Sequence, residues 1–227
     1  MGVKERQERE REAVSRAILD AARDLFVAEG YGHVSIRKIA ERIEYSPAAI
    51  YGYFPSKDDI FFALAEEGFR VLFACTAETD GFGDHNRDAG DPVESIRRAL
   101  MHVYEFSKSH PEYYALMFLD RSVPRISKDW GRFGFVREMR LRMDAVIQRA
   151  IDAGQFPAGS RPDALFRVLL ASVHGASTLR LCDRLSPGED ADALAHDALE
   201  ATLAGLRGGS PVTSQGSIDC TDSSTLQ

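Results

Sequence analysis

The stretch from residue 46 to residue 57 combines side chains of three kinds: small, hydroxyl-bearing and basic. Ala48, Ala49 and Gly52 are too small to build a hydrophobic core, but they allow another surface to approach the backbone closely. Around them stand groups that can contact phosphate oxygens: Ser46, Tyr51, Tyr53 and Lys57. Phosphate groups are bound by hydroxyls, basic side chains and the amides at helix N-termini. The segment therefore predicts a small helix that lies against a nucleic-acid duplex.

The net charge of the whole chain argues mildly against nucleic-acid binding, but the local charge around the candidate contacts does not. The formal net charge is -7, whereas phosphate binding depends on Lys and Arg. Between Ser35 and Lys57, however, four basic residues outnumber two acidic ones: Arg37, Lys38, Arg42 and Lys57 against Glu41 and Glu44. This small excess lies on the segment that carries the candidate contacts.

Two short helices are predicted around this segment. Ser35 is placed as an N-cap before Ile36, and Ile39, Ala40 and Ile43 share one face of the helix that follows. A second helix begins at Pro47, with Ser46 as its N-cap, and ends before Pro55. Two short helices joined by a tight turn form a helix-turn-helix, whose second helix can enter the DNA major groove.

Helical periodicity dominates the remainder of the chain, so the sequence predicts an all-α fold. An N-terminal three-helix helix-turn-helix head spans 1–56, a larger helical ligand-binding and dimerisation domain spans 57–207, and 208–227 form a disordered tail. The expected helices outside the helix-turn-helix run from about Glu10 to Glu29, from Ser56 to about 80, from Asp91 to His110, from Pro111, from Asp129 to Gly154, from Pro162 to Leu185 and from Pro187 to Leu206.

The N-terminal quarter resembles one known family. Gly30-Tyr31-Gly32, then the run from Val34 to Ala40, then the run from Ser46 to Asp58 are similar, in order and spacing, to the N-terminal signature of TetR-family transcriptional regulators. The resemblance implies a repressor that binds a palindromic operator in duplex DNA as a homodimer. It also implies that a small apolar or aromatic effector releases this repressor from the operator. It also implies the DNA contacts: Ser35, Arg37, Ser46, Ala48, Ala49, Tyr51, Tyr53 and Lys57.

Two positions depart from the family pattern. Glu44 stands where a turn glycine is frequent. Because glutamate has a β-carbon, a left-handed backbone conformation is less favourable there. Tyr53 replaces a frequent histidine. The runs His110–Tyr114 and Val173–Ala176 are also similar to C-terminal domains of one subgroup, the WHG type.

Aromatic and methionine side chains in the C-terminal helices are candidates for the effector pocket, because such side chains form adaptable apolar walls. They are Met101, Tyr104, Tyr114, Met117, Phe118, Trp130, Phe133, Met143 and His174. Ordinary core packing is the alternative for most of them, and His174 is either a polar group in the pocket or a satisfied core histidine.

The last two predicted helices are rich in small and aliphatic residues, which suits a four-helix dimer interface built from two helices of each protomer. The residues concerned are Leu165, Val168, Leu169, Ser172, Ala176, Leu179, Leu194, Ala198, Ala201 and Leu203. An intramolecular bundle is the alternative.

Other function classes receive little support. No catalytic motif or metal-ligand spacing is present, so we expect no enzyme activity, no metal and no cofactor. No apolar run could cross a membrane, and the three separated cysteines are read as reduced thiols, so a cytoplasmic protein is expected. A helical small-molecule carrier or protein-binding module that retains a helix-turn-helix head is the alternative function.

The charged N-terminus allows two interpretations. The run from Glu5 to Glu12 alternates in sign and is read as the solvated start of the first helix. An arm that touches the DNA minor groove through Arg6, Arg9 and Arg11 is the alternative.

Overall fold

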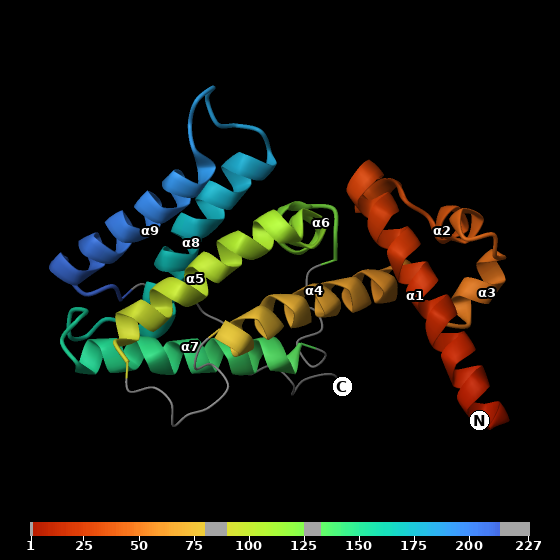
Figure 1. Cartoon of the computed structure of the whole chain (residues 1–227), viewed down its shortest axis with the longest axis horizontal. Coiled ribbons are helices and arrows are strands. Elements are labelled where there is room, and N and C mark those ends of the chain that lie inside the picture. The colour runs from red at the N-terminus through yellow and green to blue at the C-terminus, as the bar shows by residue number, and fades with distance from the viewer. Residues whose placement is uncertain (1, 80–89, 125–132, 214–227) are drawn as a thin grey trace, which may run out of the picture. The chain divides into compact units, whose positions relative to one another are not determined.

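The computed structural model describes residues 2–79, 90–124 and 133–213, and every regular element in these ranges is helical (Figure 1). This confirms the predicted all-α fold. The elements are α1 (Val3–Glu29), a 3-10 turn η1 (Tyr31–His33), α2 (Ile36–Arg42), α3 (Pro47–Tyr51), α4 (Lys57–Thr79), α5 (Pro92–Ser109), α6 (Pro111–Tyr114), a π-helical turn η2 (Ala115–Leu119), α7 (Gly134–Asp152), α8 (Pro162–Leu181) and α9 (Ala191–Gly208).

Two predicted helix starts are wrong. The first helix begins at Val3 rather than near Glu10. Ion pairs between successive turns, such as Arg6 to Glu10 at 3.0 Å, stabilise the helical conformation of the charged run. The last helix begins at Ala191 rather than at Pro187, because Asp190 is its N-cap and accepts hydrogen bonds from the amides of Asp192 and Ala193. The beginning of the helix predicted from Asp129, and with it Trp130, lies outside the described residues.

The chain divides into two compact units. The first comprises Met1–Glu78 and Glu105–Arg137, and the second comprises Thr79–Tyr104 and Glu138–Gln227. The first unit therefore holds the helix-turn-helix segment together with most of α4 and the segment from the end of α5 to the start of α7. The division of the sequence at residue 56 stays a prediction.

Aromatic packing dominates the interior of the first unit. The rings of Phe26 and Tyr31 lie 5.0 Å apart, and Tyr31 meets Phe61 edge-on at 5.7 Å. Further along α4, Phe69 contacts Phe133 at 6.1 Å, also edge-on. Edge-to-face pairs of this kind add stabilisation beyond the apolar area that they bury. The hydrophobic core of the helix-turn-helix is thus continuous with that of α4.

In the second unit, α8 and α9 lie side by side (Figure 1) and share a core with α5 and α7. Tyr104 is fully buried and donates a hydrogen bond to Asp192 Oδ1 at 2.7 Å. Arg97 pairs with Glu200 at 2.5 Å, which joins α5 to α9 about two turns further along. These contacts make α9 an integral part of the second unit.

The turn that ends α2 contains a non-glycine residue in the left-handed region. Glu44 has φ 60, while the Tyr45 amide bonds the Ala40 carbonyl at 2.9 Å and the Glu44 amide bonds the Glu41 carbonyl at 3.3 Å. These two bonds form a Schellman motif, in which the left-handed position usually holds glycine. The departure seen in the sequence therefore has a structural counterpart, since a glutamate occupies a backbone conformation that favours glycine.

We predict that Glu44→Gly stabilises the protein by about 0.5–1 kcal/mol, because glycine meets no Cβ clash at φ 60. Glu41→Gly, three residues earlier inside α2, serves as the matched control and should destabilise by about 0.5–1 kcal/mol. Chemical denaturation of both variants measures the difference. Equal destabilisation by the two substitutions would contradict the assignment.

Candidate nucleic-acid interface

The first helix of the candidate interface, α2, is set by its cap. Ser35 accepts a hydrogen bond from the Lys38 amide at 3.2 Å, as the sequence predicted. Ile39 and Ala40 are buried, which turns Arg37 outward, where it pairs with Glu41 at 2.9 Å. Both partners are well exposed, so the pair costs little to open. The Arg37 guanidinium is therefore available to an approaching anion.

The second helix, α3, begins at Pro47 as the sequence predicted, but it ends at Tyr51, earlier than the end predicted just before Pro55. Ser46 accepts from the Ala49 amide at 3.2 Å, and Pro47 occupies the first helical position. Ile50 is fully buried and anchors the helix to the core. On the outer side, Ala48 is exposed and the Tyr51 side chain is 55% exposed. The helix thus presents a small residue and a tyrosine hydroxyl to its surroundings.

The C-terminal end of α3 contacts the first helix. Arg11 donates to the Gly52 carbonyl at 3.2 Å, and its guanidinium lies over the Tyr53 ring at 5.1 Å from the ring centre. Tyr53 is half-buried in this position. The N-terminal part of α1 is therefore in contact with the predicted reading helix, a contact between residues 41 positions apart.

Lys57 has a second role besides the one that the sequence suggested. Its ammonium group donates to the carbonyls of Tyr31 at 2.8 Å and Val34 at 2.9 Å, and it lies 3.9 Å from the centre of the Tyr31 ring. These contacts fix η1 to the start of α4. Direct contact between Lys57 and DNA stays a prediction.

The turn η1 is also held from the segment that follows η2. The Tyr31 amide donates to Asp120 Oδ2 at 3.2 Å, and the Gly32 amide donates to Ser122 Oγ at 3.2 Å. The Tyr31 hydroxyl bonds Asp58, and burial together with this carboxylate raises the pKa of Tyr31. The connection between α1 and α2 is thus fixed from both α4 and the residues after η2.

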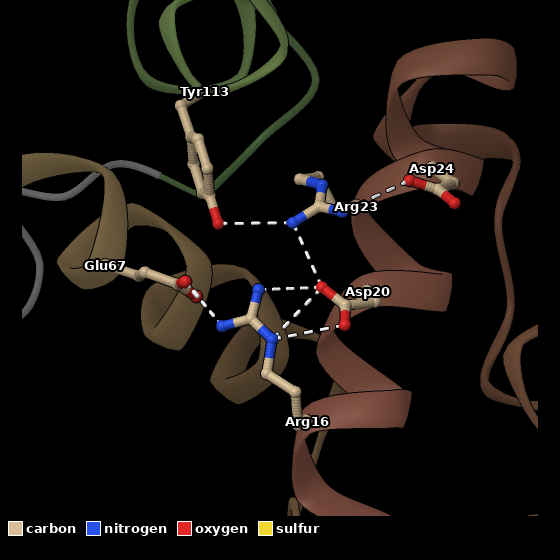
Figure 2. A network of polar contacts seen from close by, with 6 residues as sticks. All are labelled: Arg16, Asp20, Arg23, Asp24, Glu67 and Tyr113. Carbon is tan, nitrogen blue, oxygen red and sulfur yellow. Dashed lines mark hydrogen bonds and ion pairs between the residues drawn. The ribbon is translucent and has the colours of Figure 1, made fainter. Parts of the chain in front are cut away.

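A polar network joins α1 to α4 and α6 (Figure 2). Arg16 pairs with Asp20 at 2.7 Å on its own helix and with Glu67 at 2.5 Å on α4. Arg23 pairs with Asp20 at 3.0 Å and donates to the Tyr113 hydroxyl at 3.3 Å. Because Asp20 accepts from two arginines, one carboxylate orients both cross-helix contacts. The Arg16 hydrogen bond is the main cause that lowers the pKa of Asp20.

Two exposed residues near the candidate interface lie outside the predicted set of DNA contacts. Tyr45, in the turn between α2 and α3, is 44% exposed. Its position outside the apolar pattern of both helices was the available signal. Arg42 is exposed at the end of α2 and was counted only as local charge.

The pocket candidates lie in both compact units. Tyr114, Met117, Phe118 and Phe133 belong to the first, where Tyr114 and Phe118 lie 5.0 Å apart and Phe69 contacts Phe118 at 5.9 Å. Met101, Tyr104, Met143 and His174 belong to the second. Met101, Tyr104 and Met143 pack in or against the core of that unit, in agreement with the core alternative. Burial lowers the pKa of His174, so its imidazole is neutral near pH 7. A role for any of these residues in effector binding stays a prediction.

Other kinds of site are not evident in the described part of the chain. There, no cluster of histidine, cysteine, aspartate or glutamate residues could hold a metal ion, and Cys182 is an exposed free thiol. None of the helices in those ranges combines the length and apolar character needed to cross a bilayer.

We predict that Asp20→Asn destabilises the protein in a pH-dependent way. A carboxylate whose pKa is lowered in the folded state contributes stability above its unfolded pKa, about 3.9, and loses it as pH falls through the folded pKa. The wild-type chain should therefore be more stable than the variant near neutral pH, and the difference should shrink between about pH 5 and pH 2. Thermal unfolding at stepped pH measures this. A difference of the same size throughout that range would contradict the network.

Comparison with known proteins agrees with this architecture. The family model for bacterial regulatory proteins of the tetR family matches residues 18–64, and the model for the tetracyclin repressor-like C-terminal domain matches residues 96–202. The chain is 44% identical over 106 residues to the HTH-type transcriptional repressor Rv1474c of Mycobacterium tuberculosis, covering 43% of this chain and 56% of that protein. It is 27% identical over 134 residues to the repressor AcnR of Corynebacterium diphtheriae, covering 58% of this chain and 60% of that one.

A solved structure is similar along most of the chain. SmeT, the repressor of the Stenotrophomonas maltophilia multidrug efflux pump SmeDEF, matches with a TM-score of 0.62 and 25% identity, over 87% of this chain and 95% of that one. The matches to the two curated repressors span just over half of their length. The WHG subgroup stays a prediction. With family models matched in both its N-terminal and C-terminal parts, the chain belongs to the TetR family of bacterial regulatory proteins.

Proposed function

We propose that the protein is a transcriptional repressor that reads a palindromic operator with α3 and is released from it by a small apolar or aromatic effector. The observation that carries the proposal is the outer face of α3, where Ala48 and the hydroxyl of Tyr51 are exposed while Ile50 is fully buried. The relatives Rv1474c and AcnR are both named as transcriptional repressors, which supports repression as the sign of regulation.

The chemistry of α3 suits the major groove. A short helix with small side chains can approach base edges closely, and the methyl group of Ala48 or Ala49 can contact the methyl group of thymine. Tyr51, Ser46 and Arg37 stand around these residues as groups that hydrogen-bond phosphate oxygens. In this arrangement the alanines distinguish between sequences, and the polar groups fix the position of the helix on the duplex.

The exposed faces of α8 and α9 support a homodimer formed through these two helices. Val168, Ala171, Gly175 and Leu179 are exposed at helical spacing along α8, and the α9 face offers Ala201, Ala204 and Gly205. Val168 and Leu179 are 40% and 39% exposed. By contrast, Leu165, Leu169, Ala176 and Leu203 are buried within their own subunit, as the intramolecular alternative requires. Of the predicted set, the interface that we propose therefore keeps the exposed Val168, Leu179 and Ala201, and it adds the exposed small residues beside them.

The aromatic residues on and after α6 are the part of the first unit that we assign to the effector. Phe118 is 37% exposed and forms ring contacts with Tyr114 and Phe69. The π-helical turn η2 holds Phe118, and such turns are frequent at functional sites. The same segment ends at Asp120 and Ser122, which bond η1. An effector bound beside Phe118 would weaken operator binding by a coupling of about 1–3 kcal/mol.

We predict that substitutions on α3 separate into two classes. Tyr51→Phe removes a phosphate contact and should weaken binding by a similar factor on every duplex, whereas Ala48→Ser should change which base is preferred at one position of each half-site. Binding of both variants to duplexes selected by the wild-type chain from a random pool, at fixed salt, measures the effects. A Tyr51→Phe variant that shifts base preference, with no shift for Ala48→Ser, would contradict the assignment.

We predict that Leu179→Glu dissociates the dimer, because it places a charge in the proposed apolar interface. Leu141→Glu is the matched control, since Leu141 on α7 is 58% exposed and outside that face. Sedimentation velocity should show a dimer for the wild type and the control and a shift toward monomer for Leu179→Glu. Identical sedimentation of the two variants would show that α8 does not form the interface.

A further inference from the structure

We infer that Arg11 is a positioning residue for the reading helix, and that the charged extension of α1 acts on DNA binding through α3 rather than as an arm in the minor groove. The inference rests on the DNA-binding function proposed above. It concerns a residue that lies outside the helix-turn-helix segment and outside the DNA contacts that the family resemblance implies.

The extension is helical, not an extended arm. Val3 to Glu12 continue α1 without a break, and the three arginines of this run have different partners. Arg6 pairs with Glu10 at 3.0 Å, and Arg9 donates to the Glu5 carbonyl at 3.3 Å, both within the helix. Among these three, Arg11 makes the contact that leaves the helix.

The periodicity of α1 explains why Arg11 differs. Arg11 precedes the fully buried Ile18 by seven residues, and Ile18 precedes the fully buried Ala22 by four. Residues at these spacings lie along one face of a helix, so Arg11 lies on the face that packs against the core. Arg9, two residues earlier, lies on a different face. The extension therefore carries its core-facing stripe two turns beyond the buried part and places Arg11 next to the end of α3.

A contact from Arg11 can stabilise the C-terminal end of α3, because a helix this short depends on contacts with its surroundings. The helix is a single turn anchored by Ile50 and, after its end, by Phe54, which is 9% exposed. The Gly52 amide bonds the Ala49 carbonyl at 3.1 Å, and the amides of Tyr53 and Phe54 bond the Ile50 carbonyl at 2.9 and 3.0 Å. The Gly52 carbonyl instead accepts from Arg11. A cation at a helix C-terminus is favourable because the carbonyls there carry partial negative charge.

The guanidinium also fixes the side chain that follows. It lies over the ring of Tyr53 at 5.1 Å, a geometry in which the cation and the aromatic face attract each other. Arg11 thus contacts both the carbonyl of Gly52, the C-cap of α3, and the side chain of Tyr53, a predicted DNA contact. A guanidinium supports both because it is planar and donates in a fixed fork, which the ammonium of lysine does not reproduce.

The salt dependence of DNA binding distinguishes positioning from direct phosphate contact. The slope of log affinity against log salt falls by about 0.9 for each phosphate contact that is lost. Arg11→Ala should weaken binding to a duplex selected by the wild type about three- to tenfold and leave this slope unchanged. Arg9→Ala removes the same charge two residues away and should stay within about twofold of wild type. Arg11→Lys should recover little of the loss, because it keeps the charge and loses the fork.

The coupling between Arg11 and Tyr53 gives a second readout. If Arg11 acts partly through Tyr53, the double variant Arg11→Ala, Tyr53→Ala should lose less DNA affinity than the product of the fold-losses of the two single variants. A slope reduced by about one for Arg11→Ala and for Arg9→Ala alike would assign both to phosphate contact and overturn the inference. Full recovery by Arg11→Lys, or unchanged affinity in Arg11→Ala, would overturn it as well.

A measurement without DNA separates this inference from the proposed function. Amide hydrogen exchange of the free protein should show faster exchange at Tyr53 and Phe54 in Arg11→Ala than in Arg9→Ala, because the end of α3 loses its tie to α1. Equal exchange in the two variants would overturn the positioning role. Failure of the wild-type chain to select any duplex would instead overturn the proposed function, whatever the exchange result.

Discussion

The shortness of α3 is the constraint on which the rest of the first unit depends. Five residues form one helical turn, and isolated helices shorter than about 12–15 residues are marginal in water. A helix of this length has a defined position only if its surroundings impose one. Ile50 supplies an apolar anchor, Ser46 closes the N-terminal end, and Arg11 contacts the C-terminal end.

These local supports are themselves held by longer elements. Lys57 on α4 and Asp120 and Ser122 after η2 bond the backbone of η1, which connects α1 to α2. The Arg16 and Arg23 network ties α1 to α4 and α6 (Figure 2). Each contact is modest on its own, since exposed ion pairs contribute about 0–1 kcal/mol. Together they connect the helix-turn-helix to the segment that holds Tyr114 and Phe118. A displacement of that segment would therefore also displace η1.

The parts of this arrangement that follow from local rules could be predicted from the sequence. Ser35, Ser46 and Pro47 occupy the cap positions expected of them, because a cap depends on residues within one turn. The special backbone at Glu44 could be anticipated from the family resemblance, because Glu44 stands where a turn glycine is frequent. The all-α class followed from periodicity, which is set by the burial of one helix face.

The contacts that position the site could not be predicted, since they join residues far apart in the sequence. Nothing local indicates that Arg11 reaches Gly52, or that Lys57 bonds the carbonyls of Tyr31 and Val34. Among the candidate interface leucines, Leu165 and Leu179 look alike in the sequence, yet one is buried in the subunit and the other is exposed. Only the packing of α8 on its neighbours separates them.

The location of the DNA-reading surface is the central claim, and amide hydrogen exchange with and without a selected duplex tests it most directly. The account predicts that added duplex slows exchange within residues 35–57, with the strongest change from Ala49 through Phe54, and leaves α8 and α9 unchanged. Protection that falls on α8 and α9 while residues 35–57 exchange as before would contradict it.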